Sequence, residues 1–79
     1  MDEIQLAAEL RRMYDGAKRN EAACQVHLFG IRYAEELQQY PLKRILKLSG
    51  LSSGYLSEIS KGIKLAQYVT LREGGESDG

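Results

Sequence analysis

The side chains whose types and spacing point most clearly to chemistry lie between residues 42 and 71. Five of them are basic, namely Lys43, Arg44, Lys47, Lys61 and Lys64. Only one acid, Glu58, lies among them, so this stretch carries a net charge of +4, whereas residues 1–41 and 72–79 each carry −2. Because the whole chain is neutral, this asymmetry indicates an anionic partner for the basic stretch, with a solvated lysine-rich surface as the alternative.

The other reactive side chains do not form a site. Cys24 and His27 are three residues apart, a spacing that can place two metal ligands on one helix face, but the sequence has no further cysteine or histidine. Cys24 also lacks the basic surroundings that activate a thiol. Gly50 and Gly54 are not followed by the Gly-Lys-Ser/Thr of a phosphate-binding loop. We therefore expect no catalytic residue, no metal and no cofactor, and a binding protein rather than an enzyme.

The composition is that of one small globular domain. The chain has 79 residues, of which 43% are hydrophobic and 28% are charged. Zero net charge argues against a protein that binds by bulk charge. A lone cysteine excludes an internal disulfide and is typical of a reducing cytosol. With no apolar run long enough for a membrane span and no secretory signal, we expect a cytoplasmic protein. The predicted domain covers residues 1–71, and the Gly-rich acidic residues 72–79 predict a disordered tail.

Two predicted helices precede the basic stretch, over residues 2–15 and 19–38. Apolar residues recur along both of them at the spacing of one helix face. In the first helix these residues are Leu6, Leu10, Met13 and Ala17. In the second helix they are Ala22, Val26, Phe29, Tyr33 and Leu37. Pro41 ends this segment, because the residue before a proline is disfavoured in the α conformation.

The second of these helices has another apolar stripe, formed by Cys24, Leu28 and Ile31. A helix that is apolar on two sides needs a cover on both. Two alternatives follow: the helix over residues 2–15 covers the stripe, or the stripe forms a twofold homodimer. Gly30 in the middle of this helix costs about 1 kcal/mol relative to alanine, and it marks either a close backbone approach or a bend.

Two short helices joined by a tight turn are predicted over residues 42–49 and 53–61. Gly50 can adopt the left-handed conformation that ends the first helix. Ser52 can cap the second helix, and Gly62 is expected just past its end. The apolar residues expected to face inward are Leu46, Leu51, Leu56 and Ile59. This pattern is that of a helix-turn-helix.

The elements together predict an all-α fold, a small bundle of three or four helices that contains the helix-turn-helix. Beyond it, residues 66–71 alternate weakly between apolar and polar side chains. This alternation predicts an extended segment, with a short C-terminal strand as its regular form.

The run from Leu51 to Gly62, LSSGYLSEISKG, resembles the helix-turn-helix of the Xre/Cro/phage-repressor family. The serine cap, the Tyr-Leu-Ser core and the closing glycine recur in that family at this spacing. The resemblance covers residues 42–62, with two departures: Leu46 stands where the family usually has alanine, and Leu42 where it often has a phosphate-binding glutamine. The family's two closing helices have no room in this chain, so the motif is expected on a different scaffold.

The flanking runs HLFGIRYA at residues 27–34 and KLAQYV at residues 64–69 are similar to small helix-turn-helix-like proteins of prokaryotic defence loci. Together the resemblances imply binding of double-stranded DNA by a transcriptional repressor or by a DNA-repeat-binding or targeting factor. The alternative, motivated by the second apolar stripe, is a protein-interaction module or a subunit of a larger defence or restriction assembly. Such a protein would keep the fold without binding DNA.

The Xre/Cro resemblance also implies roles for individual residues. The second helix of the motif would enter the major groove, and the first would lie across the backbone. The residues expected to contact base edges are Ser53, Tyr55, Ser57 and Glu58. Glu58 would suit the N4 donor of cytosine. The residues expected to contact phosphates are Ser52, Lys43, Arg44, Lys47, Lys61 and Lys64.

Overall fold

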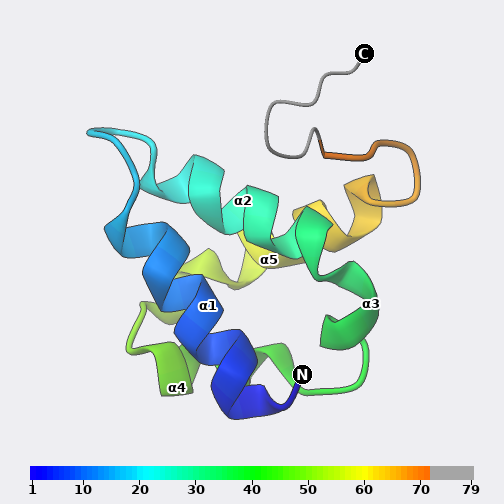
Figure 1. Ribbon diagram of the computed structural model, residues 1–79, viewed down its shortest axis with the longest axis horizontal. Helices are drawn as coiled ribbons and strands as arrows, with labels where there is room; N and C mark the ends of the chain where they lie inside the picture. Colours follow the sequence, from blue (N-terminus) through cyan, green and yellow to red (C-terminus); the bar gives the residue numbers. More distant parts are fainter. Residues whose placement is uncertain (72–79) are drawn as a thin grey trace.

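The computed structural model describes residues 1–71, and over these residues the chain is built from helices (Figure 1). In chain order they are α1 (Glu3–Asp15), α2 (Ala22–Arg32), α3 (Ala34–Leu37), α4 (Leu42–Ser49), the 3-10 helix η1 (Ser53–Tyr55) and α5 (Leu56–Leu65). The predicted all-α class is confirmed. The predicted tail, residues 72–79, lies outside the described residues.

The core lies where α1, α2, α4 and α5 meet. α1 packs against α4, and α2 lies along α5 (Figure 1). The largest fully buried side chains are Phe29, Leu6, Leu10, Leu37, Ile45, Leu46, Ile59 and Val26. Leu51 and Leu56 are partly buried and pack against this core. The inward side predicted for both helices of the motif is therefore confirmed.

The start of α1 is fixed by its own sequence. The Asp2 side chain accepts a hydrogen bond from the Gln5 amide at 2.8 Å, and the Gln5 side chain accepts one from the Asp2 amide at 2.9 Å. This reciprocal pair satisfies two amides that a helix start would otherwise leave without partners. The predicted extent of the first helix, residues 2–15, agrees with the structure to within its cap.

The helix predicted over residues 19–38 is wrong in its extent, because the structure has two helices there. Residues 19–21 form a turn, and α2 starts only at Ala22. At Tyr33 the backbone leaves the helical region, with φ −111° and ψ 26°. The chain changes direction at this point (Figure 1), so that α3 packs against α5 and its Ala34 and Leu37 are buried. The gain from burying these two side chains explains a break that no proline or glycine marks.

Gly62 was predicted to lie past the end of its helix, but it lies inside α5, where its backbone touches α2. A Cβ atom added to Gly62 would lie 2.4 Å from the His27 carbonyl oxygen. A Cβ atom added to Gly30 would lie 2.6 Å from the Ile59 carbonyl oxygen. The two glycines thus allow α2 and α5 to meet backbone to backbone. Of the two alternatives for Gly30, the close approach is the correct one, since α2 continues through it.

The short strand predicted over residues 66–71 is absent from the described chain. After α5 the backbone winds through further turns, in which the Tyr68 and Val69 amides donate to the Leu65 carbonyl at 2.8 and 3.0 Å. Residues 1–71 contain no other strand with which this segment could pair. A weak alternation of side chains is not enough to form a strand without such a partner.

Candidate nucleic-acid interface

The turn between α4 and α5 is built around Gly50. This residue takes φ 78°, in the left-handed region that an L-residue enters only at a cost. Its amide donates to the Lys47 carbonyl at 3.1 Å, and the Leu51 amide donates to the Leu46 carbonyl at 3.2 Å. This pair of bonds is the Schellman arrangement, which ends a helix sharply. The predicted role of Gly50 is confirmed.

Two serines fasten the turn on either side of Gly50. The buried Ser49 hydroxyl donates to the Leu46 carbonyl at 2.7 Å and accepts from the Leu51 amide at 3.3 Å. Ser52 accepts from the Gly54 amide at 3.1 Å, so it caps η1 as predicted. Sequence reasoning missed Ser49, and its position before a helix-ending glycine was the available signal. The turn therefore holds α4 and α5 in a fixed relation.

The outer side of η1 and α5 is polar and basic. Ser57, Lys61 and Lys64 follow one another at helical spacing, and all three are exposed. Ser53 is exposed at the start of η1. The predicted DNA-contacting residues that the structure leaves exposed on α4, η1 and α5, or in the turn between them, are Lys43, Arg44, Lys47, Ser52, Ser53, Ser57, Lys61 and Lys64.

Arg44 differs from the other exposed basic residues, because it joins α4 to α1. Its Nε atom lies 2.9 Å from Glu3 Oε1 in an ion pair, although the arginine side chain is 59% exposed. A phosphate contact by Arg44 would have to share its guanidinium with this carboxylate.

Tyr55 faces α1 rather than standing out from η1. Its ring meets that of Tyr14 edge-on, with 5.7 Å between the ring centroids and 75° between the planes. A hydrogen bond with the Tyr14 hydroxyl, assisted by burial, raises the pKa of Tyr55 above the ordinary value. The Arg11 guanidinium lies 5.6 Å from the centre of the Tyr14 ring. Tyr55 therefore fixes the start of α5 to the end of α1.

Glu58 lies at the boundary between α5 and α2. Its Oε1 atom is 3.3 Å from His27 Nδ1, and the two side chains are 30% and 29% exposed. His27 Nε2 is buried, without a hydrogen-bond partner among the described residues. The sequence placed Glu58 on the outer side with Ser57, whereas the structure gives its carboxylate a partner within the chain.

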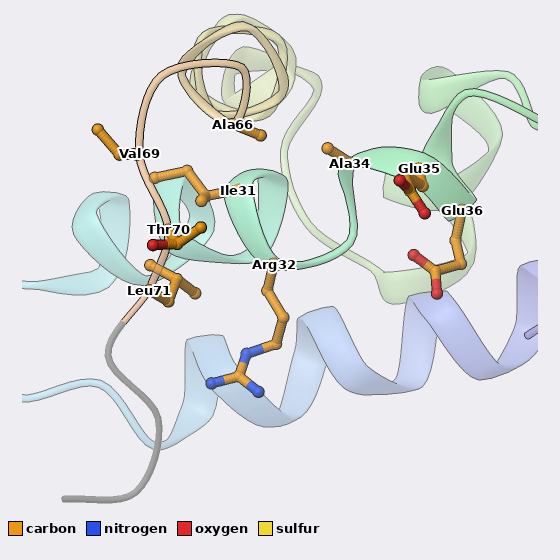
Figure 2. A pocket seen from close by; sticks show the side chains of 9 residues that line it. All are labelled: Ile31, Arg32, Ala34, Glu35, Glu36, Ala66, Val69, Thr70 and Leu71. Atoms are coloured by element: carbon orange, nitrogen blue, oxygen red, sulfur yellow. The ribbon is translucent and has the colours of Figure 1, made fainter. Parts of the chain in front are cut away.

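The apolar stripe on α2 has a partial cover that sequence analysis did not foresee. Cys24 is exposed, but Leu28 and Ile31 are only partly exposed. Residues 66–71 pass beside Ile31. Together with α2 and α3 they line a cavity of about 480 Å³ that is open to solvent (Figure 2). The partial cover over Ile31 thus comes from residues 66–71 rather than from α1.

Neither a metal centre nor a membrane span is found in the part of the chain that the structure describes. Among residues 1–71 no three His, Cys, Asp or Glu side chains come together as metal ligands. No helix in this range is long and apolar enough to cross a membrane.

Comparison with known proteins identifies the family. Residues 2–72 match the family described as an HTH-like domain. The chain belongs to this family. No curated protein and no solved structure matches the chain. The HTH-like domain takes in α1 to α3 as well as the motif itself, so the match supports a helix-turn-helix family without singling out Xre/Cro or the defence-locus proteins.

Proposed function

We propose that this HTH-like domain binds double-stranded DNA, with η1 and α5 in the major groove and α4 across the phosphate backbone. The observation that carries the proposal is the exposed polar and basic outer side of α5, held by a turn of defined geometry. A helix on such a turn is the element with which helix-turn-helix proteins contact base edges.

The exposed residues divide into two roles. Ser53 and Ser57 are short and polar and supply hydrogen bonds to base edges. The exposed lysines contact DNA phosphates, which positions the protein on the duplex without distinguishing sequences. They are Lys43, Lys47, Lys61 and Lys64. Tyr55 and Glu58 join the base contacts only by giving up their contacts with Tyr14 and His27, so we assign them the smaller share.

The finer role that we propose is sequence-specific recognition in the cytoplasm, by a repressor or by a factor that binds DNA repeats and targets a larger assembly. The resemblance of residues 42–62 to phage repressors motivates it. The proposal contains no enzymatic step. A homodimer through Cys24, Leu28 and Ile31 remains a prediction, and sedimentation of the free and the DNA-bound protein tests it.

A protein-interaction module is the second candidate, and a different surface favours it. Ile4 on α1 is 71% exposed and Leu48 on α4 is 43% exposed. Both line the same shallow groove, with Ala7 and Ala8 beside them. Apolar residues gathered at the surface are typical of a contact with another protein.

The main proposal is tested by measuring binding to short DNA duplexes of random sequence by fluorescence anisotropy at several salt concentrations. Each phosphate contact releases about 0.9 counterion, so four lysines predict a log–log salt slope of about −3 to −4. An affinity that does not depend on salt, or no binding at low salt, would favour the interaction module. Selection from a random DNA library would then identify the preferred site.

A further inference from the structure

Two basic residues outside the helix-turn-helix stand on the turn between α1 and α2. Lys18 and Arg19 are both exposed. The Glu21 amide donates to the Lys18 carbonyl at 2.9 Å and closes the turn. Asn20 takes φ 68° within it, a conformation that asparagine tolerates better than most residues. The turn therefore presents the two cations from a defined backbone.

Three contacts place this turn at the end of the molecule where α5 begins. Tyr14, just before the turn, packs against Tyr55 of η1. Along α2, His27 meets Glu58, and further on Gly30 meets Gly62. The two helices therefore run in the same direction, and the start of α2 lies near the start of α5. Figure 1 shows the α1–α2 turn and the start of α5 at the same end of the molecule.

The DNA-binding geometry leaves one phosphate backbone without a partner from α4. The major groove is about 12 Å wide, so a helix inside it has a backbone strand on either side. α4, with Lys43 and Lys47, lies on one side of α5, and α2 lies on another (Figure 1). On the α2 side, the turn with Lys18 and Arg19 supplies cations for the second strand, in addition to those that α5 itself carries.

We propose that Lys18 and Arg19 form a second phosphate-binding site, which contacts the DNA strand opposite the one that α4 contacts. This inference rests on the proposed DNA binding and extends its footprint beyond the motif. The acid at the same turn, Glu21, is exposed and makes no side-chain capping bond to α2. In the proposed complex its negative charge lies beside the two cations and opposes binding to that strand.

The test compares two double variants that change the net charge equally. Lys18→Gln with Arg19→Gln removes two positive charges from the turn. Gln38→Glu with Gln39→Glu adds two negative charges at exposed positions that follow α3, at the other end of the long axis (Figure 1). Screening over about 10 Å at 0.1 M salt keeps the control charges from acting on the proposed site.

With two further phosphate contacts the unaltered protein should show a salt slope of about −5, and the turn variant a slope smaller by about 1.8, in the range of −3 to −4 expected for the four lysines alone. Its loss of affinity relative to the unaltered protein is then about tenfold larger at 50 mM than at 200 mM salt. The control should keep the slope of the unaltered protein, and Glu21→Gln should bind more tightly. Thermal melts of all variants check that folding is retained.

The outcomes separate this site from the function on which it rests. Binding by the unaltered protein with an unchanged slope in the turn variant overturns the second phosphate site alone. An equal loss of affinity in the control variant would assign the effect to net charge and would also overturn the second phosphate site. No binding by the unaltered protein overturns the proposed function and the second site together.

Discussion

On its α2 side, α5 is held by backbone contact, and on its outer side it carries long charged side chains. The first side has Gly62 against Gly30, with no room for a Cβ atom on either. The second has Lys61 and Lys64, both exposed. Close packing fixes a position to a fraction of an ångström, whereas exposed lysines tolerate movement and act through charge.

This difference assigns separate consequences to substitutions on the two sides. A change on the α2 side should alter stability first and DNA binding only through folding. A change on the outer side should alter binding and leave the melting temperature almost unchanged. Glu58 lies between the two sides, so a substitution there shows whether this position contributes to stability or to DNA binding.

The largest effect is expected for Gly62→Ala. The new methyl group would meet the His27 carbonyl oxygen, a backbone atom that cannot rotate away. Overpacking of this kind costs about 1–3 kcal/mol, and a backbone clash belongs at the upper end of that range. The higher helix propensity of alanine offsets about 1 kcal/mol of this cost. We expect a net loss of about 2 kcal/mol, or about 8–16 °C in Tm, by thermal unfolding.

The control for Gly62→Ala is Gly54→Ala. There the new methyl group would lie 3.3 Å from a side-chain atom, Ser52 Oγ, which has some freedom to move. A small drop in melting temperature for Gly54→Ala and a large drop for Gly62→Ala would support the close backbone packing of α5 against α2. Equal melting temperatures for both variants would contradict it.

Gly50→Ala should cost about 1 kcal/mol, because alanine pays to adopt the left-handed conformation that this turn requires. Chemical denaturation measures the loss. Gly50→Asn is the matched variant, since asparagine adopts this conformation more readily, and it should recover part of the stability. Equal stability of the alanine and glycine proteins would mean that the turn does not need a left-handed residue.

Lys47→Ala should leave the free energy of unfolding within about 0.5 kcal/mol of that of the unaltered protein, as for most exposed positions. It should weaken binding to every DNA sequence alike and reduce the salt slope by about 0.9. Anisotropy titrations measure both effects. A loss confined to one DNA sequence would instead make Lys47 a base contact.

The smallest effect is expected for Glu58→Gln. Glutamine has almost the same size as glutamate and alters only a partly exposed contact with His27, so stability should change by less than about 0.5 kcal/mol. Removing a negative charge near the phosphates should strengthen binding slightly for all sequences. Loss of preference at a single base pair, by about 1–3 kcal/mol, would instead make Glu58 a base-reading residue, as its position in the motif predicted.

The helix-turn-helix could be predicted because its signals are local. Gly50 and Ser52 act within a few residues of their own position, and the spacing of Leu56 and Ile59 defines the inner side of the helix. Such features depend little on the rest of the fold. The same holds for the start of α1, where Asp2 carries its own capping signal.

The remaining features depend on partners that are distant in the sequence. Gly62 looks like a helix end until Gly30 is placed against it. The break at Tyr33 follows from the burial of α3 against α5, and no residue type announces it. Glu58 lies on the outer side of an isolated helix, and only the packing of α2 brings His27 beside it. The resemblance of residues 42–62 to a known motif could not predict these contacts with α2 and α3.

The central claim is that the outer side of α5 faces DNA, and an NMR titration with duplex DNA tests it most directly. Backbone amide shifts should change along α4, in the turn at Gly50 and on η1 and α5, with a further set at residues 18–21. The α1 residues that line the exposed groove, Ile4, Ala7 and Ala8, should remain unaffected. Shifts confined to that groove, or none at any DNA concentration, would contradict the account.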